Sequence, residues 1–147
     1  MNNLPFSVCV CASPSDREAA MRIRFTVFVD EQQVPPELEP DEYDADALHL
    51  LLVDEAGIAV GTARIVEKPG QTAKIGRVAV LASHRGQGVG AFLMQETMQH
   101  ARLRGLTRAI LDAQTRAIPF YERLGFVAEG PEFDDAGIPH RHMTRAL

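Results

Sequence analysis

Apolar residues along this chain occur in short runs, either continuous or alternating with polar residues, and turn residues separate the runs. Such runs predict β-strands at 6–11, 48–53, 58–66, 73–81, 107–111, 126–129 and 139–144. Apolar positions at helical spacing predict helices at 14–29, at about 92–104 and at 115–124. The resulting order of elements mixes hairpins with crossovers, which is typical of an α+β domain with a mixed α/β sheet.

The predicted helices are bounded by residues that start or stop them. The first helix begins at Ser13-Pro14-Ser15-Asp16, where a hydroxyl caps it, proline occupies its first turn and an acid lies at its positive end. It ends at Gln33-Val34-Pro35-Pro36, because proline cannot continue the backbone hydrogen-bond ladder. A connection rich in proline and acids follows, up to about Asp46. Gly105 and Gly125 are natural left-handed caps for the other two helices.

Length and composition are those of one globular domain, 1–147, since 46% of the 147 residues are hydrophobic and 24% are charged. The start of the sequence has neither a basic segment nor a long apolar segment, so no signal peptide is expected. No apolar stretch approaches the roughly 18–20 residues that span a membrane, and we expect a cytoplasmic protein without a membrane partner. Cys9 and Cys11 are too few for a disulfide framework and are expected to be buried or half-buried free thiols.

The net charge of -5 is unevenly distributed. Residues 25–63 contain ten Asp or Glu and no Lys or Arg, whereas residues 64–147 contain twelve Lys or Arg and eight acids. A nucleic-acid partner is disfavoured, because the phosphate backbone requires a broad basic face. The asymmetry is compatible with a protein that handles a cation near its acidic half and an anion near its basic half. The alternative interpretation of the acidic run is a solvated loop.

A glycine-rich stretch, Gly86-Gln87-Gly88-Val89-Gly90, joins the strand at 73–81 to the long helix. The first N–H groups of a helix have no partner within it and lie at its positive end. Glycine lets the main chain approach a ligand closely and adopt positive φ, and Arg85 adds a forked donor beside the loop. Together these features predict an anion site that suits a pyrophosphate.

The residues themselves leave two other interpretations of this loop open. The first is a turn that merely requires glycine. The second is a dinucleotide site, because Gly86-x-Gly88-x-x-Ala91 fits a loose Rossmann fingerprint and Asp112 follows on the next strand, where an acid binds ribose. Against the second, only 35 residues follow Asp112, too few for the remaining βα units. A P-loop is excluded, because no Gly-Lys-Ser/Thr follows.

Two motifs together resemble those of a known family. Arg85-x-x-Gly88-x-Gly90 is similar to the Q/R-x-x-G-x-G/A motif of the GCN5-related N-acetyltransferases (GNAT). Ala117-x-x-Phe120-Tyr121-x-x-x-Gly125-Phe126 resembles that family's A-x-x-F-Y-x-x-x-G-F segment. The intervening helix and strand agree as well, so the resemblance covers residues 73–129. Weaker similarity to one bacterial branch of the family extends over 24–32, 44–49 and 137–140.

The resemblance implies a central, mostly antiparallel sheet that is splayed in its middle and flanked by helices, with acetyl-CoA as cosubstrate in the gap. Backbone N–H groups of Val78, Ala79 and Val80 would face the acetyl carbonyl and the pantetheine arm, because fixed donors stabilise the charge that develops on the carbonyl oxygen. The pyrophosphate would be held by Arg85, Gly86, Gln87, Gly88, Val89, Gly90 and Ala91. Gln114 and Phe120 complete the implied cofactor-binding set.

Tyr121 would be the general acid of the implied reaction, since a neutral tyrosine can hydrogen-bond to and protonate the leaving sulfur. The general base is not assigned, because family members often carry an acid near position 77, where this chain has Arg77. The candidates for the base are Glu31, His49, Asp112 and His140. His140 and His142 would share a strand face, but no third ligand is evident, so no metal site is predicted.

These expectations combine into an N-acetyltransferase that moves an acetyl group from acetyl-CoA to a primary amine of a small molecule, by direct attack in a ternary complex. We expect a cationic acceptor between the first helix, the acidic connection and the final strands. Glu31, Glu42 and Asp44 are its candidate anchors, and His49 and His140 are further candidates for substrate binding. One alternative is an acyl-CoA-binding sensor or regulatory protein of the same fold without efficient transfer, and another is a nucleotide-binding oxidoreductase fragment. The sequence is compatible with a homodimer and does not fix the oligomeric state.

Overall fold

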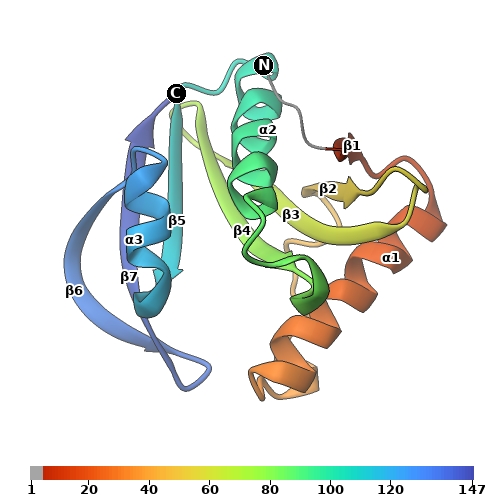
Figure 1. Ribbon diagram of the computed structural model, residues 1–147. Coiled ribbons are helices and arrows are strands. Elements are labelled where there is room, and N and C mark those ends of the chain that lie inside the picture. Colours follow the sequence, from red (N-terminus) through yellow and green to blue (C-terminus); the bar gives the residue numbers. More distant parts are fainter. Residues whose placement is uncertain (1–4) are drawn as a thin grey trace.

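Seven strands form one sheet in the computed structural model, which describes residues 5–147 (Figure 1). The strands are β1 (Ser7–Val10), β2 (Leu48–Val53), β3 (Ala59–Lys68), β4 (Thr72–Val80), β5 (Arg108–Gln114), β6 (Val127–Asp135) and β7 (Ile138–Ala146). Their order across the sheet is β1-β2-β3-β4-β5-β7-β6, and only the pair β4 and β5 is parallel. The predicted mixed, mostly antiparallel sheet is confirmed. The nucleotide-binding oxidoreductase is wrong, because that fold requires a mostly parallel sheet.

Helices cover both faces of this sheet. On one face, α1 (Pro14–Arg24) packs Ala20 and Ile23 against Leu51 of β2. On the other face, α2 (Val89–Leu103) and α3 (Ile118–Arg123) lie side by side in Figure 1. They share one core cluster with Leu50, which neighbours Leu51 but points to the opposite side. Strand alternation therefore assigns each helix to a face.

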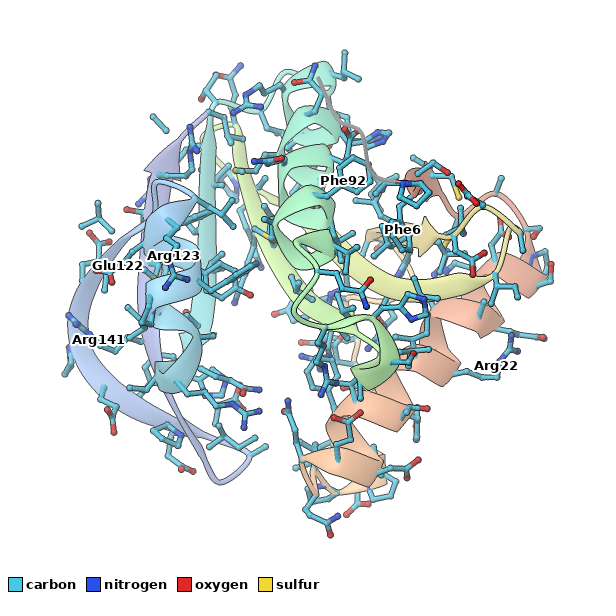
Figure 2. The ribbon with its side chains drawn as sticks, in the orientation of Figure 1. Phe6, Arg22, Phe92, Glu122, Arg123 and Arg141 are labelled. Atoms are coloured by element: carbon cyan, nitrogen blue, oxygen red, sulfur yellow. The ribbon has the colours of Figure 1, made fainter. Side chains whose placement is uncertain are left out.

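Side-chain directions along the helices follow the same division. Figure 2 shows Phe92 of α2 on the same side of the sheet as Phe6, which precedes β1, and both belong to one apolar cluster. The figure also shows Arg22 pointing outward from α1. Arg24, only two residues further along the helix, is 1% exposed. Two residues turn a helix by more than half a revolution, so Arg24 faces inward where Arg22 faces solvent.

The sheet is splayed between β4 and β5, as expected. These strands pair only at Thr72–Lys74 with Arg108–Ile110, and Figure 1 shows them diverging beyond that point. On its other edge β4 continues to pair with β3, from Lys68↔Thr72 to Gly61↔Val80. One edge of β4 therefore loses its strand partner halfway along the strand.

A β-bulge lies in β4 beside the splay. Thr62 pairs with Ala79 and Arg64 pairs with Gly76, so two residues of β4, Arg77 and Val78, oppose one residue of β3. Arg77 has a φ of 49°, which an arginine adopts only at a cost of about 1–2 kcal/mol. Bulges of this kind bend a strand and redirect its side chains. The bulge thus contributes to the divergence of β4 from β5.

Several elements differ from their predicted bounds, and β5 and β7 extend beyond theirs. The helix predicted over 14–29 is α-helical to Arg24 and continues as a π-helical segment, η1 (Phe25–Glu31), whose C-cap is Gln32; Gln33 follows with φ of 62°. The strand predicted at 126–129 runs on to Asp135, because the two turn residues Ala136 and Gly137 have φ of 54° and 80° and close a tight hairpin. Gly130-Pro131 interrupts the pairing of β6 without ending the strand, as the register shift between Glu129 and Phe133 shows.

Among the described residues there are also three short 3-10 turns: η2 (Pro36–Leu38), η3 (Ala82–His84) and η4 (Thr115–Ala117). Within residues 5–147, no helix is both long and apolar enough to cross a membrane. The prediction of no signal peptide rests in part on Met1–Leu4, which lie outside the described residues.

Cys9 and Cys11 are both free thiols. Cys11 is half-buried as expected, but Cys9 is exposed, because β1 is an edge strand. Burial, followed by the charge of Asp16, raises the pKa of both thiols, that of Cys11 to about 11. Neither thiol is therefore an activated nucleophile.

Candidate active site

A cleft of about 750 Å³ opens where β4 and β5 part. Its walls come from β4, the end of β5, α3, β7, η1 and the connection that follows η1. Lining residues from these six segments include Arg77, Gln114, Tyr121, His140, Phe28 and Asp41. The volume lies within the range of small-molecule and cofactor sites.

The unpaired edge of β4 forms one wall of the cleft. Val78, Ala79 and Val80 line the cleft and lie beyond Lys74, the last residue of β4 that pairs with β5. Backbone polar groups at such a position require hydrogen-bond partners, which a bound ligand can supply. The structure thus brings all three residues predicted to face the acetyl group and the pantetheine arm to the same wall.

The glycine loop lies at the end of this wall and opens α2. Gly86 and Gly88 both have φ of 77°, and Gly88 occupies the N-cap of α2 with no side chain capping the helix. A Cβ at either glycine would meet nothing within 4 Å, so these positions require glycine for backbone conformation rather than for space. Without a capping side chain, the first amides of α2 are available to an anion.

Gly90, the second residue of α2, has a different role. A Cβ there would lie 3.5 Å from the ring of Phe120. Phe120 is half-buried, packs edge to face on Tyr121 at 5.0 Å between ring centroids, and does not itself line the cleft. Phe120 therefore couples the start of α2 to α3 and holds Tyr121 in place.

Arg85 lies between the loop and the cleft, but its side chain already has partners. Its Nε donates to the carbonyl of Val80 at 2.8 Å, and its Nη1 lies 2.8 Å from Oε1 of Glu31. Glu31 was a candidate both for the general base and for an acceptor anchor. The ion pair instead ties the end of η1 to the glycine loop.

Tyr121 projects from α3 into the cleft, packed between Phe120 and Phe126. Burial raises the pKa of its hydroxyl to about 12. No hydrogen bond from this hydroxyl occurs within the described part of the chain. Tyr121 is therefore a neutral donor without a protein partner, at the point where the two halves of the sheet separate.

Three acids of the acidic run neutralise arginines that are buried or half-buried. Glu39, Asp41 and Asp44 form ion pairs with Arg24, Arg64 and Arg77, among them Arg24 Nη1 to Asp44 Oδ1 at 2.7 Å and Arg64 Nη1 to Asp41 Oδ1 at 2.6 Å. Burial alone would raise the pKa of Asp44, but hydrogen bonds from Arg24 and Arg64 hold it well below its usual range. We refer to these six residues as the arginine–carboxylate network. These three acids are therefore neither solvated nor free anionic anchors, whereas other acids of the run, such as Glu37 and Asp46, are exposed.

The remaining acceptor candidates of the acidic half lie away from the cleft. Glu42 is exposed and lines a separate hollow of about 390 Å³ with Lys68 and Arg104. His49 is buried on β2, where its Nε2 lies 2.8 Å from the carbonyl of Asp44. Burial lowers the pKa of His49. The contacts of His49 therefore place it among the residues that fix the acidic connection.

Two of the predicted residues at the far wall do line the cleft. Asp112 of β5 is paired with His142 of β7, at 3.0 Å, and with Lys74 of β4, at 3.7 Å. His140 is buried, and its Nδ1 lies 2.7 Å from the carbonyl of Ile138. Of the four candidates for the base, only His140 lines the cleft with no charged partner within the described residues.

One contact across the cleft is not predictable from the sequence. Gln114 Nε2 donates to Gln32 Oε1 at 2.7 Å and so joins β5 to η1, while Arg116 Nε donates to Gln114 Oε1 at 3.1 Å. The residues are 82 positions apart in the chain, and Gln114 was expected to contact the cofactor. No local sequence signal connects two glutamines at that separation, so only the fold reveals the bridge.

Comparisons with known proteins agree with this geometry. Residues 11–147 match the family model of the acetyltransferase (GNAT) domain. The uncharacterized N-acetyltransferase YjcF of Bacillus subtilis is 41% identical over 128 residues, which cover 86% of this chain and 89% of YjcF. An acyl-CoA N-acyltransferase from Pseudomonas aeruginosa superposes with a TM-score of 0.84 at 31% identity, covering 98% of this chain and 100% of that one.

Escherichia coli ElaA superposes with a TM-score of 0.83 at 29% identity, over 95% of this chain and 97% of ElaA. The family match spans the splayed sheet, the glycine loop and Tyr121 together. The chain therefore belongs to the GNAT acetyltransferase family.

Proposed function

We propose that the protein transfers an acetyl group from acetyl-CoA to a primary amine of a small molecule, by direct attack in a ternary complex. The observation that carries the proposal is the cleft between β4 and β5, which is lined by an unpaired strand edge and a neutral tyrosine, with Arg85 of the cleft wall leading into the uncapped start of α2. Each of these matches one part of the cosubstrate: the carbonyl, the leaving sulfur and the pyrophosphate.

The residues present fit acetyl-CoA. The first amides of α2 and the Gly86–Gly88 backbone would hold the pyrophosphate, and Arg85 would contribute a remaining guanidinium N–H. Backbone N–H groups of the β4 edge would stabilise the negative charge that develops on the thioester oxygen, without reorganising during the reaction. The acetyl thioester supplies the electrophilic carbon and the leaving thiol.

Tyr121 would donate a hydrogen bond to the leaving sulfur. A thiol has a pKa of about 8.5, whereas burial raises that of Tyr121 to about 12, so complete proton transfer to a solvated thiolate is uphill by about 5 kcal/mol. Hydrogen bonding carries no such penalty, and burial of the thiolate would narrow the gap. We therefore propose that Tyr121 stabilises the departing thiolate primarily as a donor.

The acceptor side of the cleft is formed by η1, the connection and β7. Because the arginine–carboxylate network occupies Glu39, Asp41 and Asp44, and Arg85 occupies Glu31, recognition of the amine does not depend on an excess of free acids. We propose a primary amine recognised by the shape and polar groups of this wall rather than by a second positive charge.

The test is release of free thiol from acetyl-CoA by the purified protein with a panel of small primary amines. Tyr121→Phe should lower kcat by roughly 10²–10⁴-fold with little change in the Kd of acetyl-CoA, because the hydroxyl acts on the leaving group. Tyr43, the other tyrosine of the chain, also lines the cleft and is no control, so retained binding of acetyl-CoA by Tyr121→Phe is the control for an intact site. Equal activity of Tyr121→Phe and the wild type would contradict the role of Tyr121.

The alternative is an acyl-CoA-binding sensor or regulatory protein of the same fold. One observation favours it: Arg77, paired with Glu39 and Asp41, occupies the position where an acid was expected. This alternative predicts that acetyl-CoA binds with no release of thiol for any amine of the panel. Steady turnover with one amine would exclude it.

A further inference from the structure

We propose that His140 is the general base that takes the proton from the acceptor amine. The inference rests on the proposed function and assigns the group that the sequence left open. His140 lies on β7, is 9% exposed and lines the cleft.

The hydrogen bond of His140 fixes its tautomer. Its Nδ1 lies 2.7 Å from the carbonyl oxygen of Ile138, and a carbonyl can only accept a hydrogen bond. Nδ1 therefore carries the proton, and in the neutral ring Nε2 holds a free lone pair. Within residues 5–147 Nε2 has no hydrogen-bond partner, whereas the ring itself is held by stacking on Phe133.

The other candidates are already engaged. Glu31 is paired with Arg85, and Asp112 is paired with both His142 and Lys74. His49 lies outside the cleft with Nε2 bonded to a backbone carbonyl. The carboxylates of Glu31 and Asp112 are engaged in these ion pairs, so His140 is the side chain of this set whose acceptor atom is unengaged within the described residues.

Strand alternation places His140 and Tyr121 on opposite sides of the sheet. Leu111 of β5 pairs with Met143 of β7, and both belong to the core beneath α2 and α3, where Tyr121 also packs. His140 pairs with Gln114, three residues from each of these, and so faces the other side. A base and a donor to the sulfur on opposite sides fit an attack in which the amine enters from one side and the thiol leaves toward the other.

The proposed step balances as follows. The ammonium form of the acceptor gives one proton to Nε2 of His140, and the freed lone pair forms the N–C bond to the acetyl carbon. The C–S bond then breaks and the electron pair leaves with sulfur, hydrogen-bonded by Tyr121. The nitrogen loses a second proton, one proton ends on the thiol and the other passes from His140 to solvent.

The test compares three variants with the amine that the wild type acetylates best in the panel. His140→Asn keeps an N–H near the Nδ1 position but has no basic atom, and His140→Gln carries a non-basic amide toward the Nε2 position. Both should lose at least about 100-fold in kcat/KM, with the Kd of acetyl-CoA changed by less than about threefold. His142→Gln is the matched control, on the same face of the same strand, and should stay within about threefold of the wild type.

Retention of kcat/KM by His140→Asn would overturn the proposal, as would an equal loss in His142→Gln. A parallel loss of acetyl-CoA binding would assign His140 a structural role instead. A second measurement needs no variant: NMR of the ring nitrogens in the wild type should show Nε2 unprotonated in the neutral ring, and a protonated Nε2 would overturn the inference even if both variants failed to fold. Failure of the wild type with every amine would refute the proposed function rather than this assignment of the tautomer.

Discussion

At the scale of single residues, positive φ values shape both ends of the β4 wall. Gly88 adopts φ of 77° without steric cost, whereas Arg77 holds 49° against its preference. Arg77 keeps that conformation because the bulge and the ion pairs with Glu39 and Asp41 fix it from two directions. The conformation of Gly88 shapes the anion site, and that of Arg77 turns β4 away from β5.

Gly88→Asp should weaken acetyl-CoA binding by at least about tenfold, because a carboxylate beside the first amides of α2 repels a pyrophosphate. Gly57→Asp is the matched control: Gly57 also has positive φ, 79°, and open space around it, but lies in the β2–β3 turn. Isothermal calorimetry with acetyl-CoA should give the wild-type Kd for Gly57→Asp. An unchanged Kd in Gly88→Asp would remove the pyrophosphate assignment.

At the scale of elements, the arginine–carboxylate network fastens the acidic connection to the sheet. Arg24 comes from α1, Arg64 from β3 and Arg77 from β4, and all three reach carboxylates within 39–44. The connection has no regular structure except η2, so these ion pairs rather than a backbone ladder position it. Ion pairs therefore hold in place the connection that forms one wall on the acceptor side of the cleft.

Asp44→Asn should destabilise the protein by about 2–4 kcal/mol, because it leaves Arg24 and Arg64 with fewer charged partners in a buried setting. Asp46→Asn is the control, since Asp46 is exposed and forms no ion pair among the described residues, and it should change stability by less than about 0.5 kcal/mol. Urea unfolding measures both. Similar midpoints for the two variants would show that the network contributes little.

At the scale of the whole molecule, the sheet consists of two parts joined by a short stretch of pairing between β4 and β5. α2 spans the sequence between these strands, and the core beneath it contains residues of both parts, such as Ile75 and Leu111. The cleft exists because this core is confined to one face and one end of the junction. A ligand that fills the cleft would connect the two parts of the sheet along the length over which β4 and β5 do not pair.

The free energy of unfolding of the wild type should depend more strongly on pH in acid than that of the Asp44→Asn variant. The pKa values of Asp41 and Asp44 lie below the ordinary value of 3.8, because the paired arginines outweigh the effect of burial. A lowered pKa in the folded state contributes stability that is fully present above the ordinary pKa of 3.8 and is lost progressively as the pH falls from that value toward the lower pKa of the folded state. Unfolding free energies measured from about pH 6 to about pH 2 should therefore drop more steeply for the wild type below about pH 4, and parallel curves would contradict the network's role.

The sequence predicts those parts of the fold that depend on neighbours in the chain. Ser13 and Pro14 mark the start of α1, and the glycines of the loop signal their own backbone conformation. The left-handed conformation of Arg77 carries no such signal, since nothing in an arginine side chain favours positive φ. The full length of β6 was not predicted, because Gly130-Pro131 is typical of a strand end. In the structure β6 continues past these residues, because it pairs with β7 on both sides of them.

The candidate site likewise has parts that depend on neighbours in the chain and parts that depend on the fold. Tyr121 and the glycine loop could be predicted because motif residues are close together in the sequence. The carboxylates of the acidic run could be located but not their partners, because charge pairing between segments far apart depends on the fold. The same holds for the availability of Nε2 of His140, which follows from one carbonyl two residues away and from the absence of competing groups in the described structure.

The parting of β4 and β5 makes the cleft a passage from one side of the sheet to the other, with α3 at one side and η1 at the other. On the proposed arrangement, the thioester carrier and its acceptor occupy separate entrances. Substitutions in η1, the acidic connection or the β6–β7 turn would then change which amine is accepted. They would leave the binding of the common carrier at the glycine loop unchanged.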